Sequence, residues 1–325
     1  MAPRVVGQNP VTKDPGGSIL PGWVDMGIVP GSPGLRAFVG GAEHAPPMML
    51  IHGLGQCVAD WPTTLVSRLT TDFRVIAFDN RDAGCSDRFE QAGAPPLFRL
   101  WLGQLVGMRL AAPAYSLADM ADDAFRVCDH FAIDQIHIVG ASMGGMIAQR
   151  MALAADNRIA SLTLIMSSSG ATDLPSPLAH IEKLMRNDTG QVTLDVALAN
   201  AITLREALAV ALTAVDRAEL RERIARSLRY GWRSGDGVTR QFAAIFDDQS
   251  RAAALSAIGT PALVIHGTLD PLVPVAHGRD LAERLSARFE NLPTMGHEIT
   301  ASLGQPIARL IADHAHATIN NSKRS

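Results

Sequence analysis

Residues 136–155 have the sequence IHIVGASMGGMIAQRMALAA, and this stretch decides the fold. It begins with a short apolar run, 136–139, that is typical of a buried strand, and it ends in a helical pattern over 146–155. The turn between them contains G-x-S-x-G. Glycine suits the positions two residues before and two after Ser142, because so tight a turn has no space for side chains there. The hydroxyl of Ser142 is thereby held above the sheet at a helix N-terminus. A glycine-rich turn whose serine caps the helix would give the same sequence.

Further apolar runs lie on both sides of this stretch. Four of them are continuously apolar rather than alternating, namely 48–51, 75–78, 162–166 and 262–265. Continuous apolar strands are typical of a parallel sheet that is covered on both faces. Helical patterns lie between them, for example at 58–70 and 116–131. Strands that alternate with helices at this spacing predict βαβ units and a doubly wound α/β sheet.

The alternation stops between about residues 171 and 255, where we find no good strand run. Amphipathic helical stretches take its place, at 177–186, 193–202, 204–214 and 217–229. We expect such an insertion to form a cap over the carboxyl edge of the sheet, where open α/β sheets bind ligands. The sequence therefore predicts an α/β core, 1–170 and 256–325, and a helical cap, 171–255.

The stretch 217–229 has a clear amphipathic pattern. Leu220, Ile224 and Leu228 share one face. The pairs Glu219–Arg223 and Glu222–Arg226 are spaced i,i+4, and we expect them on the solvent-facing side of the helix.

The composition excludes several functional classes. The chain has 325 residues, 47% of them hydrophobic, with 29 Lys and Arg against 32 Asp and Glu. Such a chain is not disordered, and its net charge of −3 supplies no basic face for a nucleic acid. No run of about 18 uninterrupted apolar residues is present. The nearest, 97–114, is broken by Arg99 and Arg109. We expect neither a nucleic-acid partner nor a membrane span.

The cysteines indicate the compartment. Cys57, Cys85 and Cys128 are widely separated and odd in number, so they are not a disulfide framework. Residues 1–17 lack the apolar core of a secretory signal. We expect a cytoplasmic protein.

A serine hydroxyl is a poor nucleophile until a base removes its proton, so a histidine and an orienting acid are expected. His297 follows a short strand-like piece, 288–292, and precedes the last helix. We take His297 as the base. His52 and His266 each end a predicted strand and suit a positioning role in a loop, whereas His137 lies inside a strand as a core residue.

The orienting acid has two candidates. Asp270 follows the strand at 262–265, so it lies at the same edge of the sheet as Ser142. An Asx turn would give the same local sequence. Asp173 is the alternative acid. The chain order of Ser142, Asp270 and His297 favours Asp270.

A developing oxyanion needs hydrogen-bond donors. The backbone N–H of Met143, at the start of a helix, is one candidate. The second is the N–H of Leu54, in the sequence HGLGQ at 52–56, although an ordinary glycine-rich turn has the same appearance. Gly53 and Gly55 lack the third glycine of a dinucleotide-binding fingerprint.

Five segments together resemble the α/β-hydrolases, over roughly residues 34–325. They are HGLG at 52–55, DNRDAGCS at 79–86, GASMGG at 140–145, HGTLD at 266–270 and GH at 296–297. The second of them resembles the branch of aclacinomycin-type methylesterases and related carboxylesterases. The resemblance implies a mostly parallel central sheet flanked by helices, with a helical cap inserted after the sixth strand.

The resemblance also implies a function. It is that of a serine hydrolase that cleaves carboxylic esters, short-chain or methyl, through an acyl-enzyme on Ser142. Asp270 and His297 complete the triad, and the amides of Leu54 and Met143 form the oxyanion hole. C–C bond hydrolases, lactonases and cofactor-free perhydrolases of the same fold stay open as alternatives, as does a non-catalytic ligand-binding member.

We expect the partner to be a small-molecule ester that contacts His52, Gly53 and Trp101. In the alternative view, the insertion that contains Trp101 packs wholly on the core. No cofactor is expected, because the triad mechanism needs none. No metal is expected either, because His314 and His316 point to different faces of a helix. The chain is expected to be a monomer or a homodimer.

Overall fold

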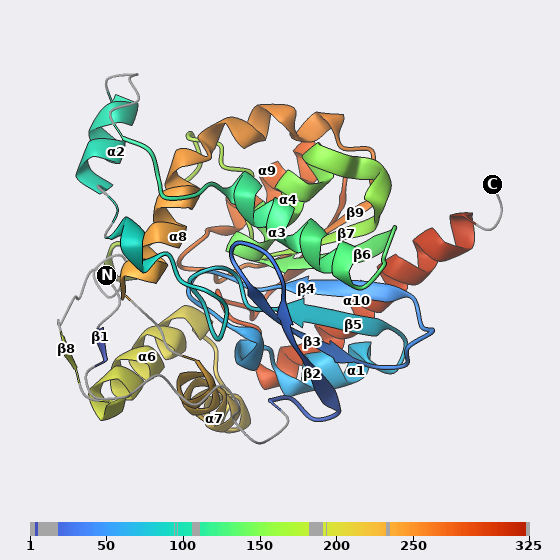
Figure 1. Ribbon diagram of the computed structural model, residues 1–325, viewed down its shortest axis with the longest axis horizontal. Coiled ribbons are helices and arrows are strands. Elements are labelled where there is room, and N and C mark those ends of the chain that lie inside the picture. The colour runs from blue at the N-terminus through green and yellow to red at the C-terminus, as the bar shows by residue number, and fades with distance from the viewer. Residues whose placement is uncertain are drawn as a thin grey trace.

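The computed structural model describes residues 4–5, 19–93, 95, 97–105, 111–181, 191–192, 194–231 and 235–322. An eight-stranded sheet forms its centre, with the strand order β10-β9-β7-β6-β4-β5-β3-β2 (Figure 1). The strands are β2 (Trp23–Val29), β3 (Leu35–Gly40), β4 (Pro47–Ile51), β5 (Arg74–Phe78), β6 (Ile136–Ala141), β7 (Ile159–Ile165), β9 (Ala262–Gly267) and β10 (Arg288–Leu292). All neighbouring strands are parallel except β2 with β3 and β3 with β5. The predicted α/β fold with a mostly parallel sheet is confirmed.

The strands predicted from continuous apolar runs are all present, whereas the edge hairpin β2–β3 is not predicted. In β2 only Trp23 and Val29, at its two ends, are buried. A strand at the edge of a sheet exposes most of its side chains to water, so it needs no continuous apolar run.

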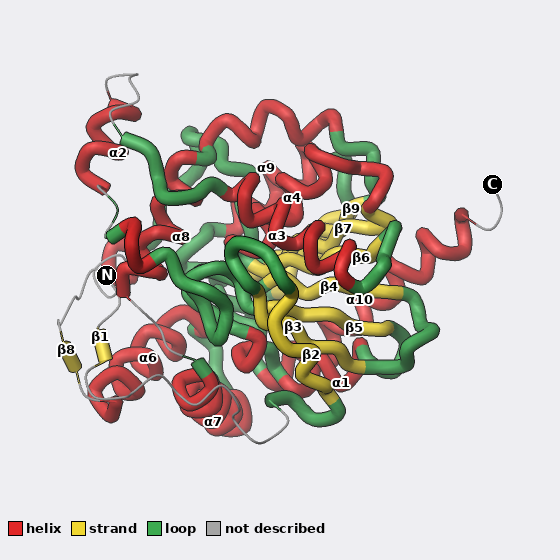
Figure 2. Tube along the Cα trace, in the orientation of Figure 1, coloured by secondary structure: helices red, strands yellow, loops and turns green. Residues whose placement is uncertain are grey.

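Helices cover both faces of the sheet (Figure 2). One apolar cluster includes residues of α3 (Leu117–His130), α4 (Met143–Ala155) and α9 (Val275–Arg284), and the other includes residues of α1 (Thr63–Leu69) and α10 (Ala301–Ser322). Successive residues of a strand join opposite clusters, as Met48 and Met49 of β4 do. Each central strand therefore buries side chains on both faces of the sheet, and most of them are apolar.

The helix predicted over 58–70 is wrong in its first half. The structure has a short 3-10 turn, η1 (Val58–Asp60), and α1 begins only at Thr63. Pro62 occupies the N-cap of α1. Because proline has no N–H to donate to a preceding turn, one helix cannot run through this position.

Helices follow β7, which is the sixth strand of the central sheet in chain order. They are α6 (Leu194–Ala209), α7 (Ala214–Tyr230), α8 (Gly235–Asp247) and η4 (Gln249–Ala257). The stretches 193–202 and 204–214, predicted as two helices, are essentially one, because no helix breaker separates them. The second half of the helix predicted over 177–186 falls within 182–190, which lies outside the described residues. A two-residue strand, β8 (Gln191–Val192), pairs with β1 (Arg4–Val5), which corrects the expectation that this interval contains no strand.

The expectation that the charged pairs of α7 face solvent is wrong for the two arginines, although Glu222 is exposed. Arg223 is only 1% exposed, and Arg226 is partly buried and donates to the carbonyl of Ala59. Leu220 and Ile224 share one face, as predicted, and that face packs in an apolar cluster with residues of α6. The side of α7 that carries Arg223 and Arg226 packs on η1 instead of facing water, which buries Arg223 and partly buries Arg226.

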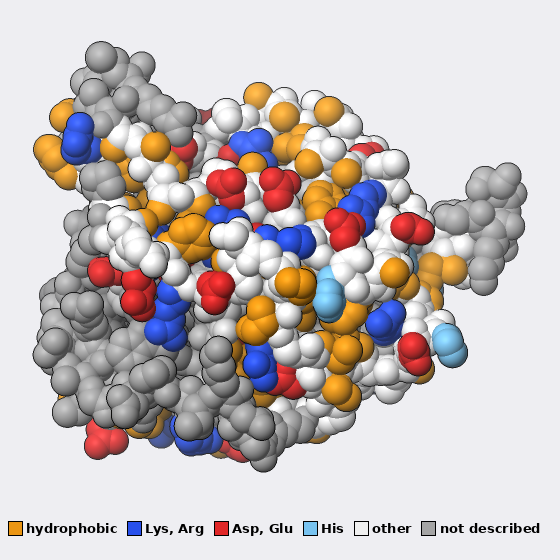
Figure 3. All heavy atoms as spheres, in the orientation of Figure 1, with side chains coloured by type: hydrophobic (Ala, Val, Ile, Leu, Met, Phe, Trp, Pro, Cys, Tyr) orange, Lys and Arg blue, Asp and Glu red, His pale blue; other side chains and the backbone are white. Residues whose placement is uncertain are grey.

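The remaining elements are short or peripheral. They are η2 (Glu90–Ala92), α2 (Leu97–Leu105) and η3 (Asp156–Arg158). No helix in the described ranges is long and apolar enough to cross a membrane. In that same part of the chain, His, Cys, Asp and Glu side chains form no group of three or more that could hold a metal ion. Acidic and basic side chains are intermixed on the face seen in Figure 3.

Candidate active site

Ser142 lies in the tight turn between β6 and α4. Its backbone has φ 53° and ψ −118°, a conformation that costs a non-glycine residue about 1–3 kcal/mol. A Cβ on Gly140 would lie 2.4 Å from the carbonyl oxygen of Gly144, and one on Gly144 would lie 2.0 Å from that of Ile51. The prediction that the turn leaves no space for these two side chains is confirmed. The serine side chain is thereby presented at the carboxyl edge of the sheet.

Two residues distant in the chain meet Ser142 at this edge. His297, in the loop between β10 and α10, has its Nε2 3.0 Å from Oγ of Ser142. Its Nδ1 is 2.7 Å from Oδ2 of Asp270, which lies in the turn after β9. With Nδ1 as the donor to Asp270, Nε2 is left as the acceptor for the serine hydroxyl. The structure thus brings Ser142, His297 and Asp270 into one hydrogen-bonded line, whereas Asp173 lies near Arg284.

The carboxylate of Asp270 has two separate tasks. Oδ1 accepts from the backbone N–H groups of Leu272 at 3.0 Å and Val273 at 2.7 Å, which is the Asx turn considered above. Oδ2 remains for His297, and Nε2 of His266 lies 3.5 Å from it. Burial raises the pKa of the Asp270 carboxyl, but the two histidines and the backbone donors outweigh it and hold this pKa well below its usual range. Asp270 is therefore charged where it faces His297.

The loop after β4 passes directly beside Ser142. A Cβ on Gly53 would lie 3.2 Å from Cβ of Ser142, so the backbone comes close to the hydroxyl. The N–H of Gly55 donates to Oε1 of Gln241, in α8, at 2.8 Å. Within the described residues, the N–H of Leu54 donates to no protein acceptor. Met143 is the first residue of α4, where an N–H has no intrahelical partner.

The sequence comparisons agree with this architecture. Residues 46–300, most of the chain, match the sequence profile of the alpha/beta hydrolase fold family. The chain belongs to this family.

Two methylesterases are among the relatives of this alpha/beta hydrolase. This chain is 28% identical over 299 residues to the rhodomycin D methylesterase DauP of Streptomyces sp. (strain C5). The match covers 83% of this chain and 91% of that protein. The rhodomycin D methylesterase DnrP of Streptomyces peucetius matches with the same identity and coverage. A solved structure, the 2-hydroxy-6-oxo-6-phenylhexa-2,4-dienoate hydrolase of Rhodococcus sp. strain RHA1, superposes with a TM-score of 0.66 at 21% identity and covers 90% of this chain and 98% of that one. The protein is a hydrolase of this fold that resembles the methylesterase branch.

The three residues expected to contact substrate in this alpha/beta hydrolase differ from one another in their surroundings. Gly53 lies beside Ser142, as described. His52 is buried, with Nε2 4.0 Å from Oδ1 of Asp79 and its ring 6.5 Å from that of Trp61. The side chain of Trp101 lies outside what the structure describes, although its backbone belongs to α2.

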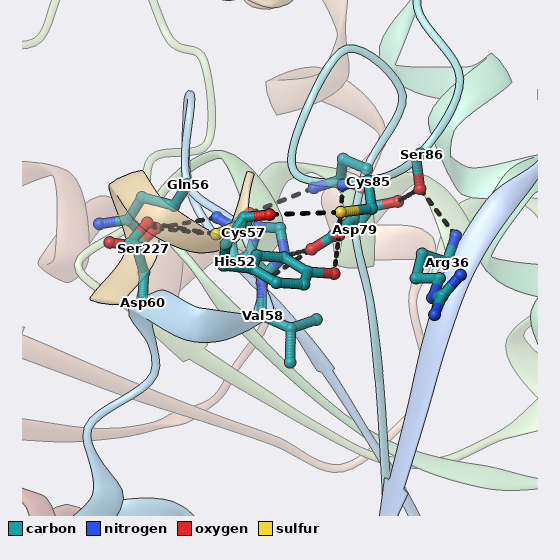
Figure 4. Close-up of polar contacts among 12 residues, drawn as sticks. Arg36, His52, Gln56, Cys57, Val58, Asp60, Asp79, Cys85, Ser86 and Ser227 are labelled. Carbon is teal, nitrogen blue, oxygen red and sulfur yellow. Dashed lines mark hydrogen bonds and ion pairs between the residues drawn. The ribbon is translucent and has the colours of Figure 1, made fainter. Parts of the chain in front are cut away.

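Asp79, the first residue of the segment 79–86, is the centre of a buried polar cluster (Figure 4). Its carboxylate accepts from the N–H groups of Val58 at 2.8 Å and Cys85 at 2.9 Å, and from the hydroxyl of Tyr230 at 2.6 Å. Burial raises the pKa of Asp79 to about 6, which these donors only partly oppose. The cluster attaches the loop after β5 to the end of α7 and lies outside the hydrogen-bonded line at Ser142.

Several residues around the site of this hydrolase are not predicted from the sequence. Gln241 contacts the loop beside Ser142, and Arg205 of α6 pairs with Glu298, the residue after His297. The position of Glu298 next to His297 is the one local signal. A glutamine or arginine on an amphipathic helix looks the same in the sequence whether it faces water or the interior. Gln241 and Arg205 therefore carry no local signal.

Proposed function

We propose that the protein is a serine hydrolase of carboxylic esters, with Ser142 as nucleophile, His297 as general base and Asp270 as the acid that orients it. The observation that carries this proposal is the line of two hydrogen bonds, 2.7 Å from Asp270 to His297 and 3.0 Å from His297 to Ser142. Such a line activates a hydroxyl, because the base takes the serine proton while the carboxylate stabilises the imidazolium that forms.

The reaction follows from these positions. Oγ of Ser142 attacks the ester carbonyl carbon while Nε2 of His297 takes its proton. The N–H groups of Leu54 and Met143 donate to the oxyanion, as their closeness to Ser142 supports. The tetrahedral intermediate then collapses, and His297 gives its proton to the departing alcohol. A water molecule, deprotonated by His297, cleaves the acyl-enzyme by the same steps and releases the acid.

We propose that the segment 171–255 acts as a cap on a core formed by 1–170 and 256–325. Its helices reach the loops on both sides of Ser142: Gln241 of α8 binds Gly55, and Leu208 of α6 accepts from the N–H of His297. A cap in contact with these loops limits which esters reach the serine.

The substrate class we propose is a small, neutral ester, short-chain or methyl. The two methylesterase relatives support this choice. Lactones and C–C bonds next to a carbonyl are cleaved by the same set of groups, so they belong in the same substrate panel.

The deciding experiment measures turnover of p-nitrophenyl acetate and butyrate. We expect Ser142→Ala to lower kcat by at least about 10³-fold, because the nucleophile is lost. Ser161→Ala is the control: Ser161 is buried and hydrogen-bonded to His137, away from the site, and should keep the activity.

A phosphonate that labels Ser142 covalently gives an independent test. Turnover that survives in Ser142→Ala contradicts the proposed mechanism. A wild-type protein with neither a burst nor a label on Ser142, but with a higher Tm in the presence of an ester, would indicate a ligand-binding protein.

A further inference from the structure

The loop that carries His297 is attached to helix α6. The N–H of His297 donates to the carbonyl of Leu208 at 2.7 Å, and Val210 forms an isolated antiparallel bridge with Met295. A Cβ on Gly296 would lie 2.2 Å from the oxygen of Leu208, so the two segments touch backbone to backbone. The last carbonyls of a helix have no intrahelical partner, which leaves Leu208 able to accept this bond.

Glu298, the next residue, is held by two arginines. Its Oε2 accepts from Nε of Arg205, in α6, and its Oε1 lies 3.1 Å from Nη2 of Arg223, in α7. All three side chains are buried. Burial raises the pKa of the Glu298 carboxyl, but the two guanidinium charges lower it below its ordinary value. Glu298 is therefore a buried carboxylate whose charge depends on α6 and α7.

The same arginines are fixed to the core through Asp60, which follows the loop beside Ser142. Nη1 of Arg205 lies 3.1 Å from Oδ1 of Asp60, and Nη1 of Arg223 donates to its carbonyl at 3.1 Å. Asp60 and Glu298 are like charges in a buried setting and repel each other. The arginines stabilise both at once.

We propose that Glu298 is a positioning residue for His297, held in place by Arg205 and Arg223. This inference rests on the proposed function, because it takes His297 as the base. Leu208 fixes the backbone N–H of His297, and the side chain of Glu298 fixes the residue that follows it. Together these contacts keep Nε2 of His297 within 3.0 Å of Oγ of Ser142. Buried ion pairs add little net stability compared with apolar side chains of similar size, so what this network supplies is geometry.

The test compares Glu298→Gln and Arg205→Met with Arg251→Met. Arg251 is a matched control, because it is buried, paired with Asp248, and bound to the carbonyl of Ser168 rather than to the loop of His297. We expect the two test variants to lower kcat for p-nitrophenyl butyrate about tenfold or more, with KM changed less than twofold. A displacement of about 1 Å at a reacting group costs about 10²-fold in rate. Arg251→Met should lower Tm and keep kcat per folded molecule.

A single change leaves a buried charge unpaired and can prevent folding. The double variant Arg205→Met with Glu298→Met removes both charges together, and we expect it to fold with a reduced kcat. The proton between Nδ1 of His297 and Asp270 is followed by NMR in parallel, with Asp270→Asn to identify its signal. We expect this signal to shift or broaden in Glu298→Gln and to stay unchanged in Arg251→Met.

Two results would overturn the positioning role. The first is kcat within twofold of wild type and an unchanged proton signal in the folded test variants. The second is a loss of kcat no larger than that of Arg251→Met. Turnover that survives in Ser142→Ala would instead refute the proposed function, and the NMR signal would still decide whether Glu298 positions His297.

Discussion

At the scale of single residues, the turn that presents Ser142 has a strained backbone. Ser142 adopts φ 53° and ψ −118°, and Gly140 and Gly144 have no space for a side chain. The strain is maintained because the N–H of Ser142 donates to the carbonyl of Ile165 at 2.9 Å, so β7 holds the turn in place. Position 142 therefore lowers stability in exchange for an accessible hydroxyl.

We predict that Ser142→Gly is more stable than Ser142→Ala. Alanine keeps the strained backbone, whereas glycine relieves about 1–3 kcal/mol of strain and loses about 0.5–1 kcal/mol through the entropy of the unfolded chain. The net gain in unfolding free energy is about 1 kcal/mol. Urea denaturation of the two inactive variants measures it. A Ser142→Gly variant that is less stable than Ser142→Ala would show that the turn is unstrained.

At the scale of elements, α8 supports the loop beside Ser142 through Gln241. Oε1 of this buried side chain accepts from the N–H of Gly55 at 2.8 Å, and Nε2 donates to the carbonyl of Arg81 at 2.8 Å. One residue of the inserted helices thus joins the loops after β4 and β5. We expect the direction of the Leu54 amide to depend on this support.

We predict that Gln241→Met lowers kcat by about 10-fold to 100-fold, because the loop loses its acceptor and a well-placed oxyanion donor is worth about 10²–10³ in rate. Gln149→Met is the matched control. Gln149 is also buried and makes two polar contacts, with Ser168 and Arg251, but it does not reach that loop. Esterase kinetics on both variants, at equal folded fraction, separate the two. Equal kcat values for the two variants would contradict the role of Gln241 in supporting the loop beside Ser142.

At the scale of the whole molecule, buried carboxylates in the loops after β4 and β5 bind the helices between β7 and β9. Three of these carboxylates each have a partner on a different helix: Asp60 with Arg205 of α6, Asp79 with Tyr230 of α7, and Asp82 with Arg240 of α8. Removing one member of a buried pair costs about 3–5 kcal/mol, because the other is left unpaired. We therefore expect the core and the helices between β7 and β9 to unfold together.

The pH dependence of stability tests the buried state of Asp79. Its pKa rises from 3.8 to about 6 on folding, so the folded protein binds a proton that the unfolded chain has lost. This stabilisation is complete below about pH 4 and disappears as the pH rises through about 6. Asp79→Asn should abolish it. The unfolding free energy of wild type relative to Asp79→Asn should fall by on the order of 2 kcal/mol between pH 4 and pH 7.

Urea denaturation across this pH range measures the difference. Tyr230→Phe serves as a second variant: it removes a donor to the Asp79 carboxylate, raises its pKa further, and should move the transition to higher pH. A difference between wild type and Asp79→Asn that is constant with pH would contradict a raised pKa.

Much of the fold could be predicted from sequence because its determinants are local. Apolar runs predict the central strands, since a strand covered on both faces is mostly apolar along its length. The glycines around Ser142 predict the turn, because a tight turn excludes side chains whatever surrounds it. The hairpin β2–β3 leaves no such pattern, because most of β2 is exposed at the sheet edge.

The surroundings of α7 show where local patterns stop. Arg223 and Glu219 have the spacing of a solvent-exposed pair, yet Arg223 is buried against Glu298. Helical periodicity shows which side chains share a face but not what packs on that face. The contacts of Gln241 and Glu298 are hidden for the same reason.

The sequence by itself determined the order of the strands along the chain, the turn at Ser142 and the residue types around it, because steric exclusion and burial act over a few neighbouring residues. Only the tertiary structure decided that His297 and Asp270 meet that serine, and that arginines of α6 and α7 hold the histidine loop. These contacts join segments far apart in the chain, and the burial that gives a charge its partner exists only once the helices have packed on the sheet.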